Sequence, residues 1–478
     1  MSSQDTQSNG DGKKKININT DAFYGQAAHK DILQHLLCEI KPVDFRAVIG
    51  LPTDEDLKQK HILFAIVKHL LKTAKERQWN LCRMYDYTYI YNGAYWKQCS
   101  KEDIKKFLSD AAVKMGHPNY EAKHYEFTDK VLKQFLSDAH LPAPEPNPDK
   151  VLINLHNGTF EFANEGWQKR DFNPDDFLTY KLPFEYNETA TCPLFDKYLL
   201  KVVTDESSRM VLQEFAGFIF TKLNFEKCLV LTGSGGNGKS VFFNILNALI
   251  GADNILNYPL GLFSDEYNRA KLTNILLNYS SEKGFDLNPD TFKTLVSGEP
   301  LQAREPYGKS FTIRNPVKFI INCNELPRET ESTEAYFRRF VIVPFDVKIT
   351  EEDKDIDLAQ KIIANELPGV FNWLLEGLNR IVKQKNFTYC EKAEKALGEF
   401  RKQADSVQLF IEEHNYKPSD NNKETLNDIY REYKTFCGDD GYKPLGKNRF
   451  SQRLESKGYE KIRRNDGMYL GIEKNVLE

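Results

Sequence analysis

The chain has 478 residues, of which 40% are hydrophobic and 28% charged, and its formal net charge is −4. This length and composition predict a globular protein of about three domains, and the lack of an apolar stretch long enough to span a bilayer excludes an integral helical membrane protein. Because the chain is net acidic, any affinity for nucleic acid must come from local basic patches.

The cysteines form no C-x-x-C pair and no Cys/His cluster with the spacing of a zinc site. Cys228 and Cys323 stand inside apolar runs, so we expect buried free thiols in a reducing cytoplasm. Residues 1–15 are polar and lack the apolar core of a signal peptide, and we expect a disordered leader there.

Residues 16–141 predict a mostly helical N-terminal domain with one aromatic hairpin. Residues 52–71 predict a capped amphipathic helix, with Asp54 and Asp56 in the first turn, where acids oppose the helix dipole. A polymerase-like metal site is the alternative for this acidic pair. Aromatic residues alternate over 85–96 around Asn92-Gly93, which predicts a hairpin. We expect its aromatics to form one face of a small sheet, with base stacking as the alternative.

Residues 142–148 are rich in proline and predict a linker. Residues 150–224 then predict a β/α region, with a second hairpin turn at Asn157-Gly158 and a helical stretch that opens at Cys192-Pro193. This region leads into the next domain, which we place at residues 225–348.

That domain carries the most informative motif, Gly233, Ser234, Gly235, Gly236, Asn237, Gly238, Lys239 and Ser240, which matches the phosphate-binding loop G-x-x-x-x-G-K-[ST]. An apolar run precedes the loop and an apolar helical pattern follows it, as the motif requires. We expect the backbone N–H groups to surround phosphates, Lys239 to reach the β- and γ-phosphates, and the Ser240 hydroxyl to hold Mg²⁺. Strands and helices alternate to about residue 344, so the fold class is α/β with a parallel sheet.

Residues 272–282 predict an apolar strand that ends in Glu282, preceded by Ser281. We expect Glu282 to bind Mg²⁺ and to act as the base that orients the attacking water. Asp265 and Asp286 are weaker candidates for the same role.

Residues 317–324 predict a second apolar strand, which ends in Asn324. Asn324 is a candidate sensor of the γ-phosphate or of the attacking water, and Asn322, two residues earlier on the same strand face, is the second candidate. The alternative for Asn324 is a turn-forming role before Pro327.

Arg338 and Arg339 follow this strand as a pair. In ring-forming ATPases arginines at this position reach the γ-phosphate of a neighbouring subunit, which would make the active enzyme an oligomer. A surface salt bridge is the alternative.

Residues 349–400 predict a helical lid or connector, and residues 401–478 a DNA-binding domain. Two amphipathic helices, over 425–436 and 447–457, precede a hairpin over 463–471, which is the element order of a winged helix. Basic residues expected to face outward and to contact DNA are Lys447, Arg449, Arg453, Arg463 and Arg464, with Lys457 beside them. A solvated charged face is the alternative.

The order of phosphate loop, Glu282, Asn324 before Leu-Pro, and paired arginine resembles superfamily 3 helicases. It is most similar to their phage and plasmid primase-helicase branch and to the poxvirus primase-helicase. The resemblance covers roughly residues 150–475, and its further supporting residues are 293–298, Ala303-Arg304, 307–309, 324–327, Asn157-Gly158, 178–183 and Cys192-Pro193.

The resemblance implies an AAA+-like P-loop NTPase core that uses ATP and Mg²⁺, a hexameric ring, and 3′→5′ movement on single-stranded DNA. It also implies a hairpin whose tip, Tyr307 and Lys309, lines the channel and contacts DNA phosphates. Expected partners are single-stranded and forked DNA, duplex or origin DNA at the winged helix, and a separate primase or polymerase, with no membrane. The implied setting is replication of a phage, plasmid or mobile element in the cytoplasm of a bacterial host.

Two other functions fit the same motifs. The chain could be a DNA-binding initiator in which ATP drives only assembly, or a defence or signalling ATPase that does not unwind DNA. Strand displacement on a forked substrate separates both from a helicase.

Overall fold

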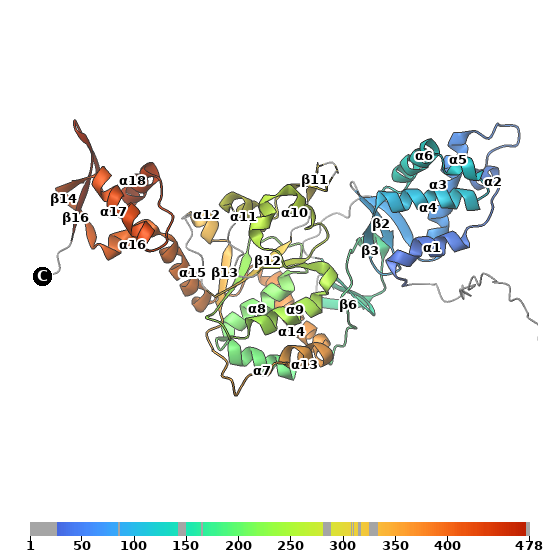
Figure 1. Cartoon of the computed structure of the whole chain (residues 1–478). Helices are drawn as coiled ribbons and strands as arrows, with labels where there is room; N and C mark the ends of the chain where they lie inside the picture. The colour runs from blue at the N-terminus through green and yellow to red at the C-terminus, as the bar shows by residue number, and fades with distance from the viewer. Residues whose placement is uncertain are drawn as a thin grey trace, which may run out of the picture. The chain divides into compact units, whose positions relative to one another are not determined.

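The computed structural model describes residues 26–474, except for residues 85–86, 142–149, 164–165, 281–287, 307, 309, 314–316 and 325–332. The chain divides into two compact units. Figure 1 colours the chain from blue at the N-terminus to red at the C-terminus. The first unit contains residues 1–145 and 171–181, and the second contains residues 146–170 and 182–478. No helix within the described ranges is long and apolar enough to cross a membrane.

The first unit is mostly helical, as predicted, with a small antiparallel sheet of order β1-β2-β3. Tyr91 of β2 pairs with Trp96 of β3, so the hairpin predicted around Asn92-Gly93 is confirmed. Tyr89, Tyr91 and Trp96 are buried, which favours the sheet-face role over base stacking. The elements are α1 (His29–Glu39), α2 (Phe45–Ile49), α3 (Gln59–Glu76), β1 (Asn80–Met84), β2 (Tyr87–Tyr91), β3 (Trp96–Cys99), α4 (Lys101–Lys114), α5 (Asn119–Ala122) and α6 (Tyr125–Asp138).

The helix predicted over residues 52–71 begins later than expected, at Gln59, and extends to Glu76. Asp54 and Asp56 therefore lie before the helix and not in its first turn. The cause is tertiary: Arg46 of α2 donates hydrogen bonds to the carbonyl oxygens of Pro52 (2.9 Å) and Glu55 (2.5 Å), which holds this segment as a turn.

Residues 171–181 belong to the first unit although 25 residues of the second unit precede them. The Trp96 indole N–H donates to the carbonyl oxygen of Pro174 at 2.8 Å, and the Phe177 ring stacks on Trp96 with a centroid distance of 5.5 Å. This returning segment closes the aromatic side of the small sheet.

The second unit begins with an antiparallel sheet of order β4-β5-β6, whose first turn follows Leu155 opposite Gly158, as Asn157-Gly158 predicted. Two helices follow, in the stretch predicted to open at Cys192-Pro193. Phe160 of β5 packs against Phe371 of helix α14, and Phe184, which follows the sheet in sequence, packs against the same ring. The elements are β4 (Val151–Leu155), β5 (Gly158–Ala163), β6 (Gly166–Arg170), α7 (Pro193–Val202), α8 (Glu206–Phe218) and α14 (Leu367–Gln384).

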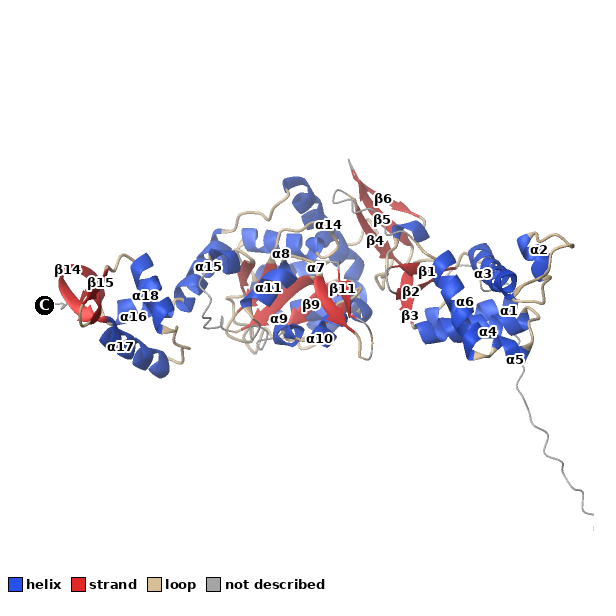
Figure 2. Ribbon diagram, turned by 90° about the horizontal axis from the view of Figure 1, so that it is seen from above, coloured by secondary structure: helices blue, strands red, loops and turns tan. Residues whose placement is uncertain are grey.

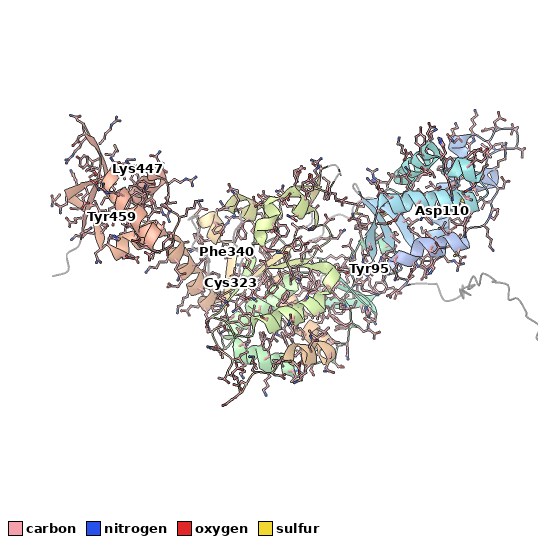
Figure 3. All side chains as sticks on the ribbon, in the orientation of Figure 1. Tyr95, Asp110, Cys323, Phe340, Lys447 and Tyr459 are labelled. Carbon is pink, nitrogen blue, oxygen red and sulfur yellow. The ribbon has the colours of Figure 1, made fainter. Side chains whose placement is uncertain are left out.

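The second unit contains a five-stranded sheet of order β13-β7-β12-β9-β8. Figure 2 draws the strands in red and labels β9 of this sheet. Every neighbouring pair in it is parallel, which confirms the predicted α/β class. Cys323 of β12 and Phe340 of β13 (labelled in Figure 3) are buried in one hydrophobic core with residues of α11 and α15. The elements are β7 (Cys228–Thr232), α9 (Lys239–Ile250), β8 (Ile255–Leu256), α10 (Glu266–Ala270), β9 (Leu277–Ser280), α11 (Pro289–Val296), β10 (Leu301–Arg304), β11 (Ser310–Ile313), β12 (Lys318–Cys323), α12 (Glu334–Phe337), β13 (Phe340–Pro344) and α15 (Glu391–Ala404).

The strand predicted over residues 272–282 is shorter, because β9 begins only at Leu277. Residues 271–274 form turns, with the Ile275 N–H donating to the carbonyl oxygen of Leu272 (3.2 Å) and Asn274 in the left-handed region at φ 62°. Asparagine tolerates that conformation, so it ends the extended pattern that the apolar residues suggested. Cys228 and Cys323 are buried free thiols, as predicted.

The C-terminal part contains the two predicted helices and the predicted hairpin, and in addition an unpredicted strand, β14, that pairs with β16. Its sequence is polar and of its residues only Tyr416 is buried, so it gives no strand pattern. The backbone pairing is interrupted by a register shift between Pro418 and Lys423. The elements, with the one remaining helix before α14, are α13 (Leu358–Asn365), α16 (Ser406–Glu413), β14 (Tyr416–Thr425), α17 (Leu426–Asp439), α18 (Lys447–Ser456), β15 (Lys461–Arg464) and β16 (Gly467–Lys474).

Candidate nucleotide-binding site

The loop of residues 233–238 joins the end of β7 to the start of α9, at the carboxyl edge of the parallel sheet. Gly235, Gly236 and Gly238 have φ values of 97°, 66° and 86°, which L-residues with a side chain rarely adopt. The backbone N–H groups of Gly236, Asn237 and Gly238 have no acceptor among the described residues. Together with the N-terminus of α9 they form a cradle suited to an anion, and the loop fits a phosphate group.

Lys239 begins α9, and its side chain returns over the loop. Its ammonium group donates to the carbonyl oxygen of Gly233 at 2.6 Å and to the Asn324 side-chain oxygen at 3.3 Å. Asn324 directly follows β12, the strand beside β7. The predicted lysine and the predicted sensor, 85 residues apart in sequence, are therefore brought together.

Two other buried polar groups lie near the carboxyl ends of β12 and of its neighbour β9. Asn322 of β12 lies opposite Leu231 of β7, and its side-chain oxygen has no hydrogen-bond partner within the described part of the chain. The Ser280 hydroxyl, at the end of β9, is likewise buried and without a partner there. Such buried polar atoms carry a desolvation cost that a bound polar group would relieve.

The acid predicted to act as base, Glu282, lies outside the described residues, as do Ser281 and Asp286. Asp265 is described, and it caps α10 by accepting a hydrogen bond from the Tyr267 N–H at 2.9 Å. It therefore has a structural role. Among the described residues no three His, Cys, Asp or Glu side chains gather as a metal site, and Ser240 is exposed at the start of α9.

Sequence reasoning missed the groups that hold the loop from outside. The Tyr198 hydroxyl of α7 donates to the carbonyl oxygen of Gly238 at 2.8 Å. The Ile349 N–H donates to the carbonyl oxygen of Gly236 at 3.0 Å, and the Asn237 side-chain amide donates to that of Val347 at 3.2 Å. Asn237 was named as part of the loop motif, whereas Tyr198, Val347 and Ile349 lie outside any recognisable motif and the sequence carries no signal for them.

The two candidate arginines differ in their surroundings. Arg338 keeps 56% of its side chain exposed and pairs with Glu226 at 2.9 Å. Arg339 keeps 8%, pairs with the same carboxylate at 3.1 Å, and donates to the Ser297 hydroxyl at 2.8 Å. Burial lowers the pKa of the Arg339 guanidinium. Of the pair, only Arg338 projects where another molecule could reach it.

The predicted channel hairpin corresponds to β10 and β11, which pair antiparallel with Arg304 opposite Ser310. Its tip residues Tyr307 and Lys309 lie outside the described residues. Arg304, next to the tip, donates from Nε to the carbonyl oxygen of Gly308 at 3.1 Å.

Of the predicted DNA-contacting residues, Arg449, Arg463 and Arg464 are exposed. Lys447 (Figure 3) is half-buried and donates to the Asn427 side chain. Arg464 lies over the Tyr469 ring at 4.8 Å from its centroid.

Arg453 and Lys457 were predicted to face outward, and this is corrected: they pair with Asp405 at 2.9 and 2.7 Å. Asp405 caps α16, and these two charges hold the pKa of its buried carboxyl below the usual value against the cost of burial. Both side chains therefore serve first to dock α18 on α16.

Three family descriptions match parts of the chain. “D5 N terminal like” matches residues 66–204, a family of unknown function (DUF5906) matches residues 231–339, and “Poxvirus D5 protein-like” matches residues 402–469. The first extends the likeness into residues for which the sequence motifs suggested no relative.

Two curated viral proteins, each described as a “Putative helicase”, are similar to the chain. The protein from Acanthamoeba polyphaga mimivirus is 25% identical over 57% of this chain and 29% of its own length. That from Invertebrate iridescent virus 3 is 24% identical over 61% of this chain and 35% of its own length. The chain thus spans about a third of the length of these relatives.

Among solved structures, the C-terminal region of NrS-1 aligns over 84% of this chain and 98% of its own, with a TM-score of 0.48 and 17% identity. The matches to the D5 families and to the viral proteins confirm the resemblance that the order of motifs predicted: this chain is similar to the phage- and poxvirus-type primase-helicases.

Proposed function

We propose that the chain is an ATP-driven DNA helicase of the superfamily 3 type that serves replication of a virus, plasmid or mobile element. The observation that carries the proposal is the meeting of Lys239 with Asn324 above the glycine loop, at the carboxyl edge of the sheet. Ligands of open α/β sheets bind at this edge. The names of the two viral relatives support the choice of helicase.

In the proposed site the loop amides and Lys239 bind the β- and γ-phosphates of ATP and offset the charge that develops during transfer. Ser240 would hold Mg²⁺, which supplies charge neutralisation between the phosphates. Glu282 would orient the attacking water and accept its proton, and Asn324 would hydrogen-bond the γ-phosphate or that water. Asn322 of β12, two residues before Asn324, is the second candidate for this role, and its side-chain oxygen has no hydrogen-bond partner among the described residues.

We assign the arginine that stabilises the γ-phosphate to Arg338 of an adjacent copy, because its guanidinium is exposed while that of Arg339 is buried. Its exposed guanidinium can leave Glu226 for a phosphate, because a surface ion pair contributes little. This assignment makes the active form a ring, and the family resemblance favours a hexamer that moves 3′→5′ on single-stranded DNA.

For DNA, we propose that Tyr307 and Lys309 grip the single strand and that the C-terminal part binds duplex as a winged helix. The order α16, β14, α17, α18, β15 and β16 supports the winged helix. Exposed Arg449, Arg463 and Arg464 give it a basic surface. A primase or polymerase would be a separate partner or lie elsewhere in a longer protein.

The deciding experiment is strand displacement on a forked DNA with ATP and Mg²⁺, comparing the natural chain with Lys239→Ala. We expect unwinding and DNA-stimulated ATP hydrolysis from the natural chain and neither from the variant. ATP hydrolysis without displacement would favour the initiator or the defence ATPase. If Lys239→Ala binds ATP as tightly as the natural chain does, the proposed nucleotide site is wrong.

A further inference from the structure

Tyr198 is a buried tyrosine of α7, in the segment that precedes the parallel sheet. Its hydroxyl donates to the carbonyl oxygen of Gly238 at 2.8 Å. Gly238 is the last loop residue before α9, so a helix from outside the sheet makes a polar contact with the loop at the turn where Lys239 begins.

The contact has a direct geometric consequence for the amide of Lys239. In a trans peptide the C=O of one residue and the N–H of the next point in opposite directions. A Gly238 carbonyl held toward Tyr198 therefore directs the Lys239 N–H away from the Tyr198 hydroxyl. The Ile349 N–H fixes the Gly236 carbonyl in the same way and so orients the amide of Asn237.

The packing around Gly238 leaves this peptide little freedom. A Cβ atom placed on Gly238 would lie 3.0 Å from the Tyr198 ring and 3.0 Å from the Val202 side chain. The Tyr198 hydroxyl is deeply buried, and burial raises its pKa well above the ordinary value, so it stays a neutral O–H donor. A phenylalanine would fill the same space, and only the hydroxyl would be lost.

We propose that Tyr198 is a positioning residue for the nucleotide phosphates: it preorganises the Gly238–Lys239 peptide so that the loop amides already face the β-phosphate. The proposal rests on the proposed function of the loop. Preorganisation raises affinity because less ordering remains to be done on binding. The Gly238 oxygen also accepts helical hydrogen bonds from the N–H groups of Val241 at 2.9 Å and Phe242 at 3.3 Å, so Tyr198 adds a third donor to a carbonyl that the start of α9 already holds.

The test compares Tyr198→Phe with Tyr459→Phe. Tyr459 (Figure 3) is also buried, and its hydroxyl donates to the carbonyl oxygen of Tyr416 at 2.9 Å, far along the chain from the loop. Each variant loses one buried hydroxyl-to-carbonyl bond. Affinities for ADP and AMP are measured by competition with a fluorescent ADP, and amide hydrogen exchange of residues 233–242 is measured without nucleotide.

We expect Tyr198→Phe to bind ADP about three- to tenfold more weakly, the range given by the loss of one hydrogen bond. AMP, which lacks the β-phosphate, should lose less than twofold, and loop amides should exchange faster in the free protein. Tyr459→Phe should match the natural chain in all three measurements.

Unchanged ADP affinity and unchanged exchange in Tyr198→Phe would overturn the proposal, as would equal losses for ADP and AMP or an equal effect of Tyr459→Phe. Lys239→Ala separates the two levels of the argument. If it abolishes ADP binding while Tyr198→Phe does not weaken it, only the positioning role fails. If Lys239→Ala also binds ADP normally, the proposed nucleotide site fails.

Discussion

Arg338 and Arg339 are consecutive residues that bind one carboxylate, that of Glu226, from opposite environments. Arg338 approaches it from solvent at 2.9 Å, and Arg339 from the protein interior at 3.1 Å. The Lys227 ammonium group also donates to the carbonyl oxygen of Arg338 at 2.5 Å, which fixes the backbone between them. The buried Arg339 and the Lys227 contact thus hold the backbone that carries the exposed Arg338.

We predict that replacing Arg338 lowers catalysis, whereas replacing Arg339 lowers stability. Arg338→Ala should leave the unfolding midpoint nearly unchanged and lower ATP turnover on the order of 10³-fold or more, as loss of an arginine supplied in trans does. Mixing it with Lys239→Ala protein should restore part of the ATPase activity, because mixed interfaces combine an intact loop with an intact Arg338. Flat specific activity on dilution, with no restoration on mixing, would contradict the ring.

Arg339→Ala should instead destabilise the protein by about 1–3 kcal/mol, since it leaves the buried Ser297 hydroxyl and the Ala335 carbonyl oxygen without the guanidinium that donates to them, while Glu226 keeps Arg338. Denaturant unfolding measures this. A stable Arg339→Ala protein with no ATPase activity would transfer the catalytic role from Arg338 to Arg339.

Replacing Glu282 and replacing Asp265 should have different effects. Glu282→Gln should bind ATP with normal affinity and lose turnover, measured by nucleotide binding and phosphate release. Asp265→Asn is the matched control: asparagine still caps a helix, so both stability and turnover should stay near their natural values. Normal turnover in Glu282→Gln would place the base elsewhere, with Asp286 next to be replaced.

The basic residues of α18 should fall into two classes. Arg449→Ala should weaken duplex DNA binding and reduce the slope of log affinity against log salt by about 1, because one phosphate contact is lost. Arg453→Ala should mainly lower stability, since it removes a partner of the buried Asp405. Binding isotherms at several salt concentrations, with unfolding curves, decide this. If Arg453→Ala reduces the salt dependence of DNA binding more than Arg449→Ala does, then Arg453 is the DNA contact and Arg449 is not.

Lys318 predicts a pH dependence of stability. Burial lowers its pKa from the ordinary 10.5 to about 7, and its ammonium group donates to the carbonyl oxygen of Leu223 at 2.8 Å. Between those two values the unfolded chain binds more protons than the folded one, so the contribution of Lys318 to stability rises with pH, by up to about 1.4 kcal/mol per pH unit. Urea unfolding at pH 7, 8 and 9 should show this rise, and Lys318→Met should lack it.

Local patterns carried most of what could be predicted from the sequence. The Asn92-Gly93 and Asn157-Gly158 turns and the glycine loop are each encoded within a few consecutive residues. The apolar runs of β7, β12 and β13 are strong because central parallel strands are buried on both faces. The loop and its meeting with Asn324 follow from these signals.

The features that were missed depend on contacts distant in sequence. Tyr198 carries no motif, and its role depends on the folded position of α7 beside Gly238. Helical periodicity placed Arg453 on an outer face, but an aspartate 48 residues earlier binds it. The strand β14 pairs through its backbone alone, so its polar side chains give no sign of it.

The return of residues 171–181 to the first unit means that the polypeptide passes between the two units three times, near residues 145–146, 170–171 and 181–182. A fragment that ends in the proline-rich linker therefore removes Phe177 and Pro174 from their places against Trp96, and exposes the aromatic side of the small sheet. A separately expressed first unit would therefore need residues 171–181 joined to its C-terminal end.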